Sequence, residues 1–171
     1  MRVLAVIGLI TIAGAAAASV YFFGGFYNVE ALEPDNKLVE WALTHIREAS
    51  IEKRAPKILP AGLDDPATIA AGARAFGERG CVACHGAPGA DWAKFSEGLR
   101  PDAADLNEVA KTLSVAEIFW VIKNGINMTG MPSFARIKVD DGEIWKIAAF
   151  VKKIPSVSPE NYKAWSGTGN P

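Results

Sequence analysis

The sequence predicts an all-α protein in which an apolar helix and an amphipathic helix precede a small helical domain. Residues 3–23 contain no charged side chain, and apolar residues recur at helical spacing between residues 37 and 54. No segment of the 171-residue chain shows the sustained alternation of apolar and polar residues that indicates a half-buried strand. These three observations favour a fold built from helices alone.

The uncharged segment at residues 3–23 has the length of a membrane-spanning helix. It contains 21 residues, and a helix needs about 20 to cross the hydrocarbon core. The Ala13–Ala18 run offers sites for signal-peptide cleavage, but the apolar run continues to Phe23 and ends in aromatic residues typical of a membrane interface. We therefore expect an uncleaved transmembrane anchor over residues 1–24. One basic residue before the span and several acidic residues after it favour a cytoplasmic N-terminus and an exported remainder.

Residues 25–61 are expected to separate the membrane from the domain. Apolar residues follow helical spacing over residues 37–54, after a turn at Glu33-Pro34-Asp35-Asn36. We expect this spacer helix to pack on the domain or on a partner rather than to lie flat on lipid. Pro56 and Pro60 then flank a stiff, extended linker.

Residues 62–155 are expected to form the domain, with three helices. An Asp-Pro pair at 65–66 supplies a capping residue and a proline at the first helical position. Ser114 and Glu117 form a capping box before a strongly apolar helix, and Asp140 precedes the third helix. Three short helices make a marginal core, so the sequence favours a large buried cofactor that completes it.

Composition and charge exclude several classes of protein. The chain has 18 Lys+Arg and 19 Asp+Glu, for a formal net charge of −1, which argues against a nucleic-acid partner. Two cysteines cannot build a disulfide scaffold. The chain also lacks a Gly-rich phosphate loop and a Gly-x-Ser-x-Gly elbow. Residues 156–171, with Tyr162 and Trp165, are expected to form a loosely attached tail.

The segment from Cys81 to His85 reads Cys-Val-Ala-Cys-His, the attachment sequence for c-type haem. One helical turn places Cys81 and Cys84 about 5–6 Å apart between Cβ atoms, so both thiols can add to one porphyrin edge. His85 returns to the same face and can bind the iron. A thioredoxin-like pair has no use for the following histidine. A zinc site would need His45 as well, and adjacent Cys84 and His85 do not fit tetrahedral geometry easily.

The second axial ligand decides whether the iron transfers electrons or binds small molecules. Met131 is the preferred candidate, because Pro132 holds it extended and Gly130 lets the backbone pass close to a flat cofactor. For Met128 we expect a role as core filler. His45, the other histidine, is expected on a solvated helix face.

These residues resemble a class I c-type cytochrome. The resemblance covers residues 62–155 and is carried by Gly72-x-x-x-Phe76, the Cys81–His85 motif, Gly130-Met131-Pro132 and the Trp145…Phe150 pair. It implies one haem c, with His85 as the proximal and Met131 as the distal ligand. It also implies a crossing of the first and last helices, in which Gly72 and Phe76 meet Ala149, Phe150 and Trp145. Arg100 would either pair with a haem propionate or remain a solvated loop residue.

The function that this resemblance implies is electron transfer without substrate turnover. The expected protein is a single-pass protein of the bacterial inner membrane with its haem domain in the periplasm, in a respiratory or photosynthetic chain. Its donor would be a membrane redox complex or a periplasmic dehydrogenase, and its acceptor an oxidase or another carrier. The stiff linker favours a bound subunit of a hetero-oligomer slightly over a free shuttle. The alternatives are an exported haem sensor or catalytic haem protein, in which Met131 is displaceable, and a purely structural exported domain.

Overall fold

The computed structural model describes residues 2–167, and these form helices and loops without any strand. They divide into two compact units, and the division falls between Pro34 and Asp35 along the chain. The expected anchor and tail include residue 1 and residues 168–171, which lie outside the described residues. The all-α prediction is confirmed.

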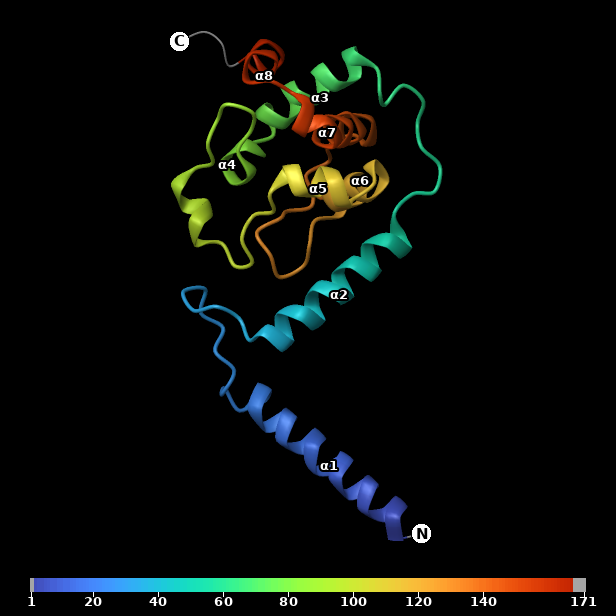
Figure 1. The fold of residues 1–171 in the computed structure, drawn as a ribbon, viewed down its shortest axis with the longest axis vertical. Helices are drawn as coiled ribbons and strands as arrows, with labels where there is room; N and C mark the ends of the chain where they lie inside the picture. The colour runs from blue at the N-terminus through green and yellow to red at the C-terminus, as the bar shows by residue number, and fades with distance from the viewer. Residues whose placement is uncertain (1, 168–171) are drawn as a thin grey trace. The chain divides into compact units, whose positions relative to one another are not determined.

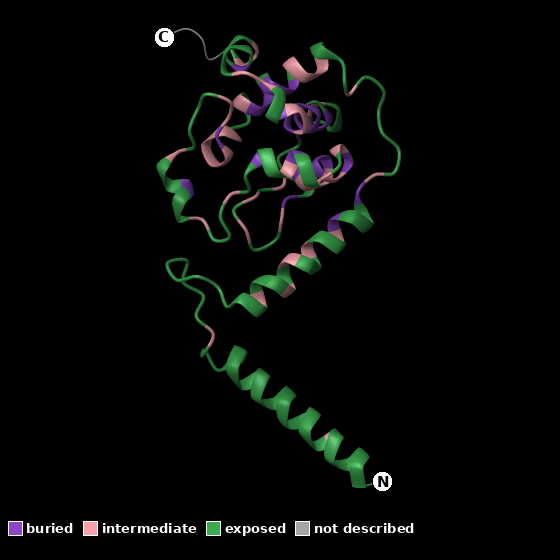
Figure 2. Ribbon diagram, viewed as in Figure 1, coloured by how far each residue is buried: buried purple, intermediate pink, exposed green. Residues whose placement is uncertain are grey.

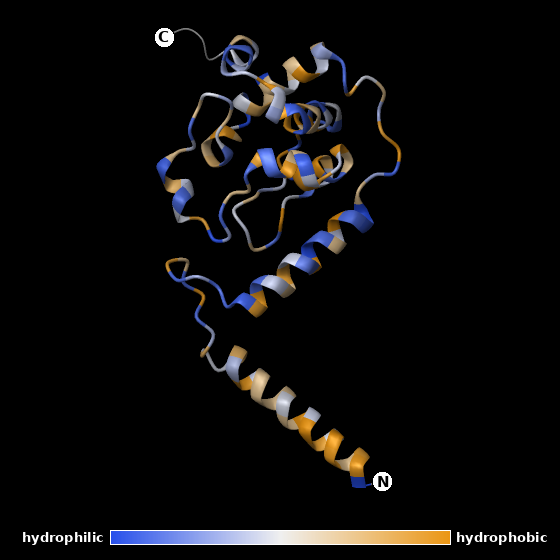
Figure 3. Ribbon diagram, in the orientation of Figure 1, coloured by the Kyte–Doolittle hydropathy of each residue, from blue (hydrophilic) through white to orange (hydrophobic). Residues whose placement is uncertain are grey.

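The first unit contains one helix, α1 (Arg2–Phe23). It is apolar along nearly its whole length (Figure 3). By length and composition it is able to cross a membrane, although a signal sequence would pass the same test. The structure thus contains an apolar helix over the span expected to be an anchor, and the anchorage itself stays a prediction.

The second unit begins with α2 (Lys37–Arg54), which matches the predicted spacer helix. The side chain of Asn36 caps it by accepting a hydrogen bond from the Leu38 amide. Its C-terminal end packs on the domain: Ile51 and Ala55 are buried, and α2 contacts α6 (Val115–Asn124). Most of the rest of α2 is exposed (Figure 2).

Helices α3 (Pro66–Glu78) and α7 (Asp141–Lys153) cross at the centre of the domain (Figure 1). A Cβ on Gly72 would lie 2.0 Å from the carbonyl oxygen of Lys146, so only glycine permits this approach. The rings of Phe76 and Phe150 meet edge to face at 5.3 Å. The expected contact of Gly72 and Phe76 with Phe150 is therefore present, whereas Trp145 stacks on Phe119 of α6 at 3.9 Å.

The predicted helix starts are found, with one difference. Ser114 and Glu117 form the capping box at the start of α6, and Asp140 caps α7 through the Gly142 amide. Asp65 occupies the cap position of α3, but its side chain makes no capping hydrogen bond there. The cap position of Asp65 and the proline at the first helical position are as predicted, and only the side-chain hydrogen bond is missing.

Several short elements were not predicted as separate helices, although the Cys81–His85 motif did predict a helical turn at the first of them. They are α4 (Val82–His85), the 3₁₀ turns η1 (Lys94–Gly98) and η2 (Ile154–Ser156), α5 (Leu106–Thr112) and α8 (Pro159–Ser166). Among them α5 is held by Lys152 of α7, whose ammonium donates to the carbonyl oxygens of Ala110 and Leu113 at 2.6 and 2.8 Å. A cation at the carbonyl end of a helix is favourable, because those carbonyls lack helical partners.

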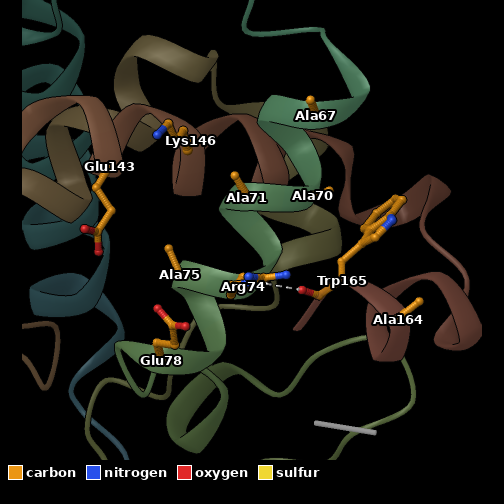
Figure 4. A pocket seen from close by; sticks show the side chains of 10 residues that line it. All are labelled: Ala67, Ala70, Ala71, Arg74, Ala75, Glu78, Glu143, Lys146, Ala164 and Trp165. Carbon is orange, nitrogen blue, oxygen red and sulfur yellow. Dashed lines mark hydrogen bonds between the residues drawn. The ribbon is translucent and has the colours of Figure 1, made fainter. Parts of the chain in front are cut away.

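The C-terminal segment is attached to the domain, which corrects the expectation of a loose tail. Helix α8 packs against α3, and its Tyr162 is only 3 % exposed. The Tyr162 ring stacks on Phe150 with centroids 5.7 Å apart. Figure 4 shows the second contact, in which the Arg74 guanidinium of α3 donates to the Trp165 carbonyl. The buried aromatic ring explains why this segment is ordered against the core.

Candidate functional site

The site is built around α4, a single turn that directly follows α3 and carries the Cys81–His85 motif (Figure 1). Cys81 caps this turn with helical backbone angles, and its carbonyl oxygen accepts from the amides of Cys84 and His85 at 3.2 and 3.0 Å. Residues three and four apart on such a turn share one face. The structure therefore brings Cys81, Cys84 and His85 together, as the motif predicted, and all three are half-buried.

Three hydrogen bonds fix this turn to its surroundings. The Cys81 amide donates to the carbonyl of Phe76 in α3 at 3.2 Å. The buried Ser96 hydroxyl donates to the Cys84 carbonyl at 2.9 Å, and the Ala93 amide donates to Ala83 at 2.9 Å. A rigid turn keeps the two sulfur atoms and the imidazole in constant relative positions. The contribution of Ser96 was not predicted, because a serine eleven residues after a motif carries no local signal.

The two thiols are free, and burial raises the pKa of Cys81 to about 12. Cys81 is therefore a neutral thiol at physiological pH in the protein without cofactor. A disulfide-exchange nucleophile has to be a thiolate. In the part of the chain that the structure describes, no group of three or more His, Cys, Asp or Glu could hold a metal ion. The raised pKa of Cys81 weighs against the thioredoxin-like alternative.

The imidazole of His85 is oriented by one backbone carbonyl. Its Nδ1 lies 2.9 Å from the carbonyl oxygen of Ala104, which follows 19 residues later in the chain. A carbonyl only accepts hydrogen bonds, so the proton must reside on Nδ1. The Nε2 lone pair is then available for a metal, and the hydrogen bond fixes the orientation of the ring. Residue type gave no signal for this partner, because the accepting atom belongs to the backbone.

Met131 lies in the loop between α6 and α7, which is fixed at several points. Its carbonyl accepts from the Ile126 amide at 3.2 Å, and its amide donates to the Thr129 hydroxyl at 3.1 Å. The Met131 side chain is half-buried against the hydrophobic core that Cys81 also contacts. Met131 and Cys81 thus both border the hydrophobic core of the domain, and the assignment of Met131 as an iron ligand stays a prediction.

Gly125 and Gly130 explain how this loop turns. Gly125 ends α6 with a positive φ of 69°, and a Cβ there would lie 2.7 Å from the Pro132 carbonyl carbon. A Cβ on Gly130 would lie 3.0 Å from the side chain of Leu99, so the loop lies close to the segment after η1. Pro132 itself is exposed.

The expectations for Met128 and for His45 have different outcomes. Met128 is 91 % exposed and has a positive φ of 57°, so the expectation that it fills the core was wrong. His45 is exposed on α2, where its ring lies 4.6 Å from that of Trp41, as a solvated helix-face histidine would.

Arg100 lies on an exposed loop and pairs with Asp102 at 3.1 Å. This ion pair with a neighbouring loop residue is compatible with both expectations for Arg100.

A cavity of about 790 Å³ lies beside Cys84 and His85. Ala104, whose carbonyl binds His85 Nδ1, is one of its lining residues. The segment after α7 also lines the cavity, through Val157 and Pro159. The proximal side of the motif is thus partly covered by a segment that was expected to be loose.

The donor set fits a covalently attached haem. It combines two unpaired thiols on one turn with an imidazole whose Nδ1 is already hydrogen-bonded. The single thioether sulfur of Met131 packs against the same core. Covalent attachment needs two free thiols and iron ligation needs a donor such as the imidazole nitrogen, and this turn supplies all three groups.

Comparison with known proteins gave one match. Residues 67–151 match the family model described as cytochrome C oxidase, cbb3-type, subunit III. The matched range includes α4, α5, α6 and the Met131 loop, and it ends within α7. Neither the curated proteins nor the solved structures gave a match to this chain.

Proposed function

Residues 67–151 form a c-type cytochrome domain, and on that premise we propose that the protein is a membrane-tethered, single-haem electron carrier of the periplasm. At the coarse level, such a domain transfers electrons. The proposal adds one electron per haem, attachment to the bacterial inner membrane through α1, and a place in a respiratory or photosynthetic chain. The orientation of His85 by Ala104 is the observation that carries it.

Each residue of the site has a defined task. Cys81 and Cys84 would hold the haem by thioether bonds, His85 would bind the iron from one side and Met131 from the other. Haem supplies a one-electron iron couple when bound, and a Met/His ligand pair raises its potential. The protein's part is to hold the imidazole in one tautomer, to present the thioether from a fixed loop and to exclude water through the surrounding core.

The two methionines of one loop provide a matched test. Met131→Ala should retain covalent haem, lower the reduction potential and let the reduced iron bind carbon monoxide. Met128→Ala should change none of these, because its side chain is 91 % exposed. The measurements are the Met-to-iron charge-transfer band of the oxidised protein, a redox titration and carbon monoxide difference spectra of the full chain in detergent. If Met128→Ala is the variant that alters the spectrum, the ligand assignment is wrong.

The same measurements separate the carrier from its rivals. Rapid carbon monoxide binding by the undamaged wild-type protein would favour a haem sensor or catalytic haem protein with a displaceable Met131. Absence of covalent haem, judged by haem staining on a denaturing gel, would favour a structural exported domain.

We further propose that the protein serves as a bound subunit of a larger oxidoreductase rather than as a free shuttle. Between α1 and the domain, α2 occupies residues 37–54 and two prolines flank the linker that follows it, so that residues 24–36 are the main part without helix or stiff linker. Purification in mild detergent, followed by identification of what co-purifies in stoichiometric amount, tests this directly. Recovery of the protein alone would favour the shuttle.

A further inference from the structure

Helix α2 carries an apolar face that the domain does not cover. Leu38, Trp41 and Ile46 are 71, 58 and 65 % exposed. By contrast, Ile51 near the C-terminal end of the same helix is 4 % exposed and packs on the domain. The helix therefore has one end docked and one end free.

The free face points away from the docked side. At about 100° per residue, Ile46 lies about 80° round the helix from Leu38, whereas Ile51 lies about 220° from Leu38. Ala42 and Ala49 fall between Leu38 and Ile46 on this count. We call the set Leu38, Trp41, Ala42, Ile46 and Ala49 the outer face of α2. Docking through Ile51 cannot bury it.

Charge on α2 is separated from the outer face over most of its length. Lys37, Glu40 and Arg47 lie more than about 90° from the centre of the outer face by the same count. Glu48 lies at its edge, about 20° from Trp41, and the imidazole of His45 lies within it, between Trp41 and Leu38. The first charged residues within the face are Glu52 and Lys53, beyond Ala49 at the domain end of the helix. The neutral stretch is thus about three turns long and ends where the domain begins.

The chain itself determines what lies within reach of this face. Helix α1 ends at Phe23 and α2 starts at Lys37, so thirteen residues join them. Fully extended, they span at most about 45 Å. Three of them, Phe26, Val29 and Leu32, are exposed apolar residues. A tether of this length holds α2 near the lipid that α1 enters, at an effective concentration that a soluble partner does not reach.

We propose that the outer face of α2 binds the surface of the lipid bilayer, with Leu38 and Ile46 entering the headgroup boundary and Trp41 at its edge. This proposal rests on the proposed anchorage of α1. An uncharged apolar face opposite a charged one is what an interfacial helix requires, and tryptophan favours this depth of the membrane. It reverses the expectation that the spacer helix avoids lipid. Because α2 also contacts α6, lipid binding would orient the haem domain relative to the membrane.

The test uses the haem-loaded full chain in phosphatidylcholine vesicles, with a protease site inserted between Leu32 and Glu33. Before cleavage, sedimentation of haem absorbance with the vesicles reports anchorage by α1. After cleavage, the haem unit should remain with the vesicles through α2 alone. Leu38→Glu should weaken this retention by about tenfold or more, because a carboxylate then faces the headgroup boundary.

Leu43→Glu is the matched control. Leu43 is 60 % exposed and lies about 140° from Leu38, outside the outer face. The same substitution there should leave retention near the wild-type level.

Each outcome decides a different point. Release of the cut wild-type unit as a monomer overturns lipid binding, as does equal loss in both variants. Release as a dimer overturns it in favour of a second copy of the chain on the outer face. An uncut chain that stays in the supernatant refutes the anchorage by α1 and removes the tether on which the inference is based.

Discussion

Gly72 is the residue at which the smallest change should disturb the domain most. It lies where α3 crosses α7, and an added Cβ would be 2.0 Å from the Lys146 carbonyl oxygen and 2.6 Å from its carbon. Both are backbone atoms, which cannot move aside by a change of rotamer. Gly72→Ala must therefore separate the two helices by more than about 1 Å, since contacts this close lie far inside normal packing distances.

The magnitude follows from two opposing effects. Overpacking a core costs about 1–3 kcal/mol, and a backbone clash belongs at the upper end of that range. Replacing glycine by alanine inside a helix gains about 1 kcal/mol. We expect Gly72→Ala to lower the free energy of unfolding by about 2 kcal/mol, which for a domain of this size lowers Tm by about 10 °C.

Gly77→Ala on the same helix is the internal control. Its added Cβ would meet the Tyr162 hydroxyl at 3.4 Å and Ser166 at 3.9 Å, which are ordinary contacts. This variant should unfold at the wild-type temperature or slightly above it, because the gain in helix propensity meets no backbone clash.

The assay is thermal and guanidinium unfolding of the haem-loaded chain in detergent, followed by Soret absorbance so that α1 does not contribute. A Gly72→Ala protein as stable as the wild type would refute the close crossing of α3 and α7. Equal destabilisation by Gly77→Ala would show that α3 tolerates no substitution, and the argument from the 2.0 Å contact would fail.

Three further predictions concern titration and capping. Burial raises the pKa of Tyr162 above its usual 10.0. The stability that the neutral Tyr162 side chain contributes is therefore complete below pH 10 and falls as the pH rises further. In alkaline denaturation, Tyr162→Phe should lose less stability than the wild type. The hydrogen bond from Arg79 at 2.6 Å lowers the pKa of Glu143 below its usual 4.5. The stabilising effect of this pair is therefore present above pH 4.5 and is lost on acidification. Glu143→Gln and wild type should differ in urea midpoint at pH 7 and converge at low pH, and a constant difference would contradict the pairing. Ser114→Ala removes the hydroxyl that accepts from the Glu117 amide, and equilibrium unfolding should show a loss of about 1 kcal/mol; an unchanged midpoint would mean that solvent replaces the cap.

The elements that the sequence predicted well are determined by residues that lie close together along the chain. The bounds of α2 followed from its apolar spacing, and the start of α6 from a capping box whose two residues are three positions apart. The failed predictions have the opposite character. Asp65 does not use its side chain to cap α3, and Met128 is exposed in a loop with a positive φ. Both outcomes depend on the path of the surrounding backbone, which residue type alone does not specify.

Sequence by itself determined the haem-attachment motif, the apolar span and the all-α class. Each depends on residues within a few turns of one another, where covalent spacing and helical periodicity already set the geometry. Only the tertiary structure decided that His85 donates to a carbonyl 19 residues away, that Tyr162 ties α8 to the core and that one face of α2 is left uncovered. The physical reason is common to all three: a backbone acceptor, an aromatic contact between distant helices and an uncovered surface are properties of how elements pack, and packing leaves no local pattern in the sequence.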